Sequence, residues 1–61
     1  MKWTQRADGH RYARHAGHIL RCRWTLTGYI ISRKEGDEWQ FIAGDTRREV
    51  AERKAEDWFS K

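Results

Sequence analysis

With 61 residues and no proline-rich, serine-rich or glycine-rich stretch to mark a linker, the chain has room for one small hydrophobic core. Its one cysteine, Cys22, excludes a disulfide within the chain. No apolar run approaches the length of a membrane span, and the N-terminal residues lack the apolar stretch of a secretory signal. We therefore expect a single domain over residues 1–61, located in the cytoplasm and not associated with a membrane.

The formal charge of +4 hides a strong asymmetry between the two parts of the chain. Residues 1–34 hold eight Lys or Arg against one acid, for a formal +7, together with all three histidines. Residues 35–61 hold five Lys or Arg against eight acids, for −3. Such a charge distribution produces a directional field, which bears on partners and association rates rather than on fold.

Turn signals divide the first part of the chain into short strands. Asp8-Gly9 predicts a type I′ turn, because both residues tolerate positive φ, and this turn would join a strand at residues 3–6 to one at 11–15. Ala16-Gly17 predicts a second tight turn, with a bulge at Gly17 in one long strand as the alternative.

A period-two pattern follows from residue 18 onward. Leu20, Cys22 and Trp24 fall on one face, which we expect to meet the core, while Arg21 and Arg23 fall on the other. Residues 25–28 form a connection, 29–33 a strand, 35–38 a turn and 39–43 the last strand, so the sheet is predicted over about residues 2–43.

Residues 46–60 are predicted to form an amphipathic helix. Thr46 and Glu49 match a capping box, in which each side chain accepts a backbone N–H of the other residue. Val50, Ala51, Ala55, Trp58 and Phe59 share one side of the helix, which can lie on the sheet. The expected fold class is therefore α+β: a small antiparallel β-meander of three to five strands with one C-terminal helix packed on one face.

Because one helix covers one face of such a sheet, the opposite face is left to water or to a partner. Arg21 and Arg23 are expected there, with Arg14 and Arg33 as neighbours if the register allows it. Lys and Arg bind phosphates with release of counterions. The lead hypothesis is thus a small nucleic-acid-binding protein without enzymatic activity, with DNA expected over RNA, whose candidate binding residues are Arg11, Arg14, Arg21, Arg23, Arg33 and Lys34.

A different class of function is kept beside it: a protein-interaction module or inhibitor that docks on a host protein, through a sheet edge or as a homodimer. Most aromatic residues are expected in the core, since Leu and Val are few, and Trp3 and Tyr12 are expected to be the most exposed.

Metal binding and catalysis find little support. His10, His15, His18 and Cys22 are of ligand types that zinc accepts, but their spacing forms no paired ligand motif, so no metal and no cofactor is expected. A pairing of Cys22 with His18 would place the two about 13 Å apart on a strand, too far for a nucleophile and its base. We expect no catalytic residue.

The order of Asp8-Gly9, basic strands, the Gly28-Tyr29 strand, a turn and a helix ending in Ala55-Glu56-Asp57-Trp58-Phe59 resembles short proteins encoded by phages and prophages. More loosely, it resembles the arm-binding AP2-like domain of tyrosine recombinases. The second resemblance implies a sheet that lies in the DNA major groove with a helix packed behind it.

Overall fold

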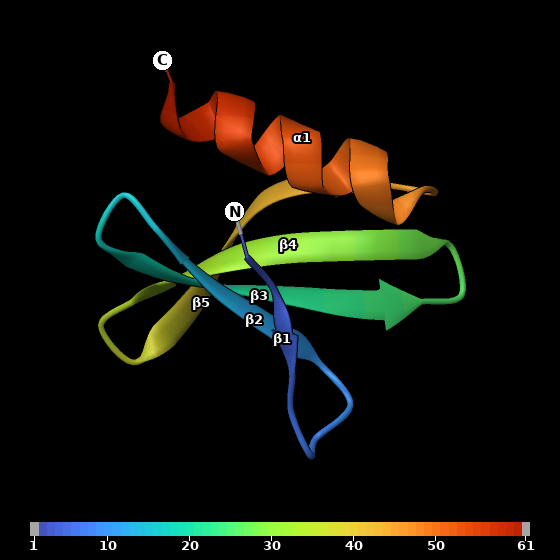
Figure 1. The fold of residues 1–61 in the computed structure, drawn as a ribbon, viewed down its shortest axis with the longest axis horizontal. Coiled ribbons are helices and arrows are strands. Elements are labelled where there is room, and N and C mark those ends of the chain that lie inside the picture. Colours follow the sequence, from blue (N-terminus) through green and yellow to red (C-terminus); the bar gives the residue numbers. More distant parts are fainter. Residues whose placement is uncertain (1, 61) are drawn as a thin grey trace.

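The computed structural model describes residues 2–60, which form five antiparallel strands and one helix (Figure 1). In chain order they are β1 (Thr4–Gln5), β2 (Arg11–His15), β3 (His18–Thr25), β4 (Gly28–Glu35), β5 (Glu38–Asp45) and α1 (Arg48–Phe59). The strands lie in the sheet in the same order as in the chain, so the sheet is a meander.

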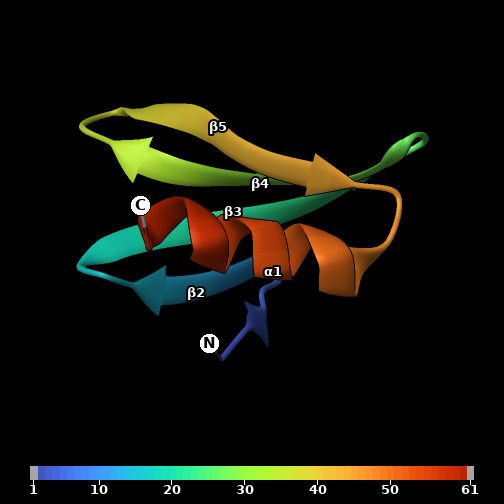
Figure 2. The ribbon, with the colours of Figure 1, turned by 90° about the horizontal axis from the view of Figure 1, so that it is seen from above.

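Helix α1 lies across one face of this sheet, with most of its contacts to β5 and β4 (Figure 2). The expected α+β meander with a C-terminal helix is therefore confirmed. We call the side of the sheet under α1 the helix-covered face and the other side the open face. None of the helices in the described chain is long and apolar enough to cross a bilayer.

The core lies between α1 and the centre of the sheet. Leu20 of β3 and Ile31 of β4 are completely buried, and so are Ala51 and Ala55 of the helix. The two alanines let the helix backbone approach the sheet closely, because their side chains are small. Trp3, Tyr29 and Phe59 close the core at its margins while remaining partly exposed.

The turns confirm one prediction and correct another. At Ala16-Gly17 both residues have positive φ, 52° and 79°, as a type I′ turn requires. The first hairpin is not a type I′ turn, because only Gly9 adopts positive φ there. The Gly9 N–H donates to the carbonyl oxygen of Arg6, and the Arg6 N–H donates to that of His10. This pattern is a three-residue loop that ends in a left-handed glycine.

The predicted capping box at the helix start is wrong. The helix begins at Arg48, one residue too late for Thr46 to be its N-cap, and the N-cap residue Arg47 has no capping side chain. Instead, the Asp45 carboxylate accepts the Arg47 backbone N–H at 3.1 Å and the Lys54 ammonium at 3.0 Å. An Asp at the end of β5 thus fixes the turn into α1.

Gly28 allows the connection between β5 and α1 to pass close to β4. Its φ is +141°, and a Cβ built there would lie 2.6 Å from the Asp45 carbonyl oxygen and 2.8 Å from the Thr46 Cα. Because both are backbone atoms, no side-chain movement could relieve the contact. A glycine is therefore required at this position.

The exposure of the aromatic residues differs from the prediction. Trp24 and Phe41 are the most exposed rings, at 67% and 62%, whereas Trp3 and Tyr12 are partly buried. Trp24 does lie on the helix-covered face, where it pairs with Tyr29, but at the end of β3. The short helix does not cover it.

Candidate nucleic-acid interface

The open face combines cations and aromatic rings on all four long strands. Strand alternation and register place ten side chains on it: Tyr12 and Arg14 of β2, Ile19, Arg21 and Arg23 of β3, Ile30, Ser32 and Lys34 of β4, and Trp39 and Phe41 of β5. Among the strands of the described chain, no Asp or Glu side chain falls on this face. The four cations therefore have no acid opposite them in the sheet.

Tight turns decide which residues share the face. His15 pairs with His18 and Thr25 with Gly28, so each turn between these strands contains two residues. With this spacing Arg14 lies on the side of Arg21 and Arg23, as expected, and so does Lys34. Glu35 pairs with Glu38, so the β4–β5 turn also contains two residues, and Trp39 and Phe41 pair with Lys34 and Ser32 on the same side.

Arg33 does not belong to this face, which corrects its predicted place. It pairs with Leu20 on the helix-covered face, where its guanidinium lies 5.4 Å from the ring centroid of Trp58. It also forms an ion pair with Glu35, and 15% of its side chain is exposed. A residue neutralised and covered in this way is not available to phosphates.

Arg11 is likewise on the helix-covered face, because it pairs with Cys22. Burial raises the pKa of the Cys22 thiol and the nearby Glu52 carboxylate raises it further, while the Arg11 charge acts in the opposite direction. Arg11 and Glu52 thus both lie near the core. Of the six candidate cations, the open face brings together Arg14, Arg21, Arg23 and Lys34 and leaves out Arg11 and Arg33.

Arg21 is part of a stacked cluster at the centre of the open face. Its guanidinium carbon lies 4.3 Å from the ring centroid of Trp39, and the Trp39 ring is 6.3 Å from that of Tyr12. The guanidinium carbon of Arg6 lies 5.1 Å from the ring centroid of Tyr12. Cation–π contacts hold both guanidinium groups in place without removing their charge.

One acid lies beside this cluster, in the turn between β1 and β2. The Asp8 carboxylate accepts the Tyr12 hydroxyl at 2.5 Å and the His10 backbone N–H at 2.9 Å. These hydrogen bonds lower the pKa of Asp8 and raise the pKa of Tyr12, mainly through the contact between the two side chains. Each carboxylate oxygen of Asp8 thus accepts one hydrogen bond, and the ring of Tyr12 is held in position.

Two hairpins give the open face its shape. The β1–β2 and β4–β5 turns both extend away from α1, below the central strands (Figure 1). Tyr12 and Trp39 come from these two hairpins, and their ring contact spans the intervening strands. The two rings therefore meet across β3 and β4 on the open face.

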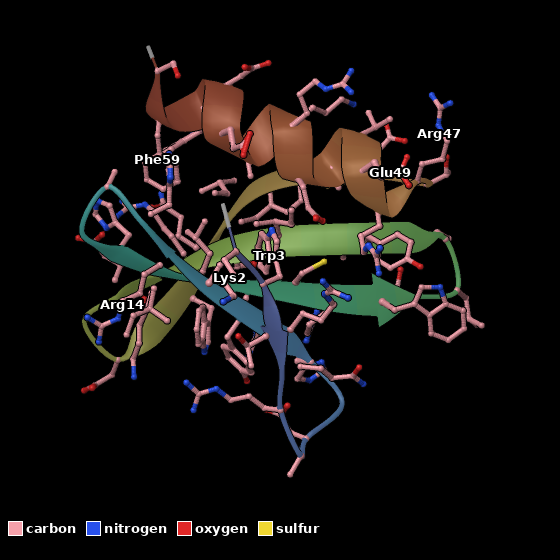
Figure 3. All side chains as sticks on the ribbon, viewed as in Figure 1. Lys2, Trp3, Arg14, Arg47, Glu49 and Phe59 are labelled. Carbon is pink, nitrogen blue, oxygen red and sulfur yellow. The ribbon has the colours of Figure 1, made fainter. Side chains whose placement is uncertain are left out.

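A cavity of about 320 Å³ opens beside the cluster, lined by three cations from the first hairpin: Lys2, Arg6 and Arg14. Thr4, Tyr12 and Ile19 complete the lining together with Ala13. Figure 3 shows Lys2 and Arg14 on the side of the sheet away from the helix. This rim extends the basic surface of the open face to β1.

Phe41 is the most exposed ring on the open face. It lies over Gly44 of the same strand, where an added methyl group would come within 3.4 Å and 3.5 Å of two ring carbons. The ring thus lies beside Gly44, and 62% of the residue remains exposed. Most of the ring is open to solvent.

Two of the three histidines, His15 and His18, and Cys22 are placed for packing. The rings of His15 and His18 contact Phe59 at centroid distances of 5.2 Å and 5.3 Å, where the end of α1 meets the β2–β3 turn. Cys22 is buried in the core. Among residues 2–60, no three His, Cys, Asp or Glu side chains gather as a metal site would require.

Sequence reasoning missed Lys2, Arg6, Trp39 and Phe41 as members of this surface. Trp39 and Phe41 were not among the candidates, because most aromatic residues were expected in the core. The overlooked signal is Gly44, three residues after Phe41, because a glycine within a strand pattern often marks a place where another group lies close to the backbone.

Comparisons with known proteins add no identity to this surface. No protein-family model, no curated protein and no solved structure matches the chain. Its function therefore has to be inferred from the geometry of the open face.

Proposed function

We propose that this protein binds nucleic acid through its open face and carries out no chemistry of its own. The observation that supports the proposal most directly is the gathering of Arg14, Arg21, Arg23 and Lys34 on the face that the helix leaves uncovered. Polyanion binding needs such a surface, because each neutralised phosphate releases condensed counterions.

The fold favours binding over solvation as the role of these charges. The acids of the second half of the chain lie on α1, on the helix-covered face and in the turns, so they do not neutralise the open face. The aromatic rings among the cations add surface against which sugars and bases can pack. A face built only for solubility has no need of a ring such as Phe41 at 62% exposure.

The test compares two double variants of equal net charge. Arg14→Glu/Arg23→Glu changes exposed residues of the open face, while Arg47→Glu/Arg53→Glu changes exposed residues of α1 and the turn before it. Each double change lowers the formal charge by four, from +4 to zero. Fluorescence anisotropy with labelled single-stranded and duplex oligonucleotides then measures Kd between about 50 and 200 mM salt.

We expect the wild-type protein to bind with a Kd that rises steeply with salt. The open-face variant should lose at least about tenfold in affinity, and the helix variant should lose much less. Arg21 is left unchanged because its stacking on Trp39 supports the fold. Equal losses in the two variants, or no binding at low salt, would contradict the proposal.

A second candidate, a protein-interaction module, is favoured by the outer edge of β5. This strand pairs only with β4 among the described strands, and its eight residues contain no Lys or Pro to discourage pairing. A partner strand, or β5 of a second copy, could add there. Light scattering across a range of concentrations tests the homodimer, and a constant monomer mass would exclude it.

A further inference from the structure

We infer that the nucleic acid recognised by the open face is single-stranded, and that Phe41 is the platform on which one of its bases stacks. This inference rests on the proposed function and specifies its substrate class. It assigns a role to an aromatic residue that the fold does not need to bury.

The geometry around Phe41 suits a flat ligand. Two of its ring carbons lie beside Gly44, and 62% of the residue is exposed to solvent. Exposed aromatic rings bind bases through their π-faces, whatever the base. The residue directly across the strand pair is Ser32, which is buried.

Cations surround the platform on its inner side. Lys34 and Ile30 are the diagonal neighbours of Phe41 on β4, and beyond them on β3 lie Arg21, paired with Ser32, and Arg23, paired with Ile30. A base stacked on Phe41 would therefore have its phosphates within reach of Lys34 and Arg23, both of which are exposed. The basic rim at Lys2, Arg6 and Arg14 continues this path across the sheet.

A duplex does not match this arrangement. Inside a duplex the faces of the bases are covered by their neighbours, and only base edges are presented in the grooves. Phe41 offers a face and no hydrogen-bonding group. A flexible single strand can also follow a path across the cations of the open face more closely than a stiff double helix can.

The experiment uses three labelled probes of equal length: an oligothymidylate of about 12 nucleotides, which falls within the range of known site sizes, its abasic counterpart, and a duplex. The decisive variant is Phe41→Leu, because leucine keeps Gly44 covered but has no π-face. Phe41→Tyr keeps the ring. The matched control is Trp24→Leu, since Trp24 is about as exposed as Phe41 but lies on the helix-covered face.

We expect wild-type protein to bind oligothymidylate more tightly than either other probe. Phe41→Leu should weaken that binding about 5- to 150-fold, as loss of one base–aromatic stack does, while leaving binding of the abasic probe unchanged. Phe41→Tyr and Trp24→Leu should remain within about threefold of wild type. Unchanged melting temperatures would show that each variant folds.

Three results overturn the inference while the proposed function stands. These are tighter salt-dependent binding to the duplex than to oligothymidylate, equal affinity for the oligothymidylate and abasic probes, and unaltered oligothymidylate binding in Phe41→Leu. A wild-type protein that binds none of the probes at low salt defeats the proposed function itself, and the inference with it.

Discussion

The two faces of the sheet are built from different chemistry although the same strands supply both. The helix-covered face holds Leu20, Cys22 and Ile31 against two alanines of α1, all nearly or completely buried. The open face holds Arg21, Trp39 and Tyr12 in a stacked cluster that remains in contact with water. Alternation along each strand allows one sequence to specify both surfaces.

The two faces contribute unequally to the stability of the fold. Full burial of a side chain such as Leu20 or Ile31 contributes about 1.5–3 kcal/mol, whereas an exposed cation–π contact contributes about 0.5–1 kcal/mol. The helix-covered face therefore determines whether the chain folds. Residues of the open face carry less of that stability, so they are free to serve a ligand.

The largest effect expected on this comparison comes from Leu20→Ala. The substitution should cost about 2–5 kcal/mol, because it removes a completely buried side chain. A domain of this size has only about 3–5 kcal/mol from its core, so the variant should be largely unfolded at 25 °C by circular dichroism.

The neighbouring Ile19 gives the matched control, since it lies on the open face and is 39% exposed. Ile19→Ala should lower the melting temperature by a clearly smaller amount. Similar losses for the two variants would mean that the faces do not differ in the way described.

An intermediate effect is expected from Trp39→Ala, which tests how much the open face contributes to stability. The variant loses two contacts of the Trp39 ring, one with Arg21 and one with Tyr12. Loss of both contacts should lower the free energy of unfolding by about 1–2 kcal/mol. Urea denaturation measures this free energy. A double-mutant cycle with Arg21→Gln should give a coupling of about 0.5–1 kcal/mol. A coupling of zero would show that the stacking contributes nothing to stability.

The smallest effect concerns the junction between the sheet and α1. The Arg47 N–H, and then the Lys54 ammonium, lower the pKa of Asp45 below its ordinary value of 3.8. A carboxyl group with a lowered pKa stabilises the folded state above its ordinary pKa, and this stability is lost as the pH falls through the folded-state pKa. Asp45→Asn should therefore melt below wild type at pH 7, and the gap should close in acid below about pH 4.

Asp37→Asn provides the control for this titration, because Asp37 lies in the exposed β4–β5 turn without these two partners. Its melting temperature should stay close to that of wild type throughout. If Asp45→Asn still melts below wild type at the lowest pH, the loss of stability comes from packing and not from the charge of Asp45.

Local patterns predicted much of the architecture. The turn at Ala16-Gly17 and the strand at residues 11–15 are where the sequence placed them, and Arg21 and Arg23 do lie opposite the core. The capping box failed because the β5 strand continues to Asp45, which leaves Thr46 in the connection and not at the N-cap. The side chain of Asp45 instead accepts the backbone N–H of Arg47, the residue just before the helix.

The sequence by itself determined which residues alternate within each strand, where the chain reverses, and that one apolar helix follows the sheet. Those features depend on neighbours a few residues apart. Only the tertiary structure decided that Lys34 joins Arg14, Arg21 and Arg23 while Arg11 and Arg33 face the helix, and that Phe41 stays exposed. These outcomes depend on the exact number of residues in each turn, because a shift of one residue moves a whole strand's side chains to the other face.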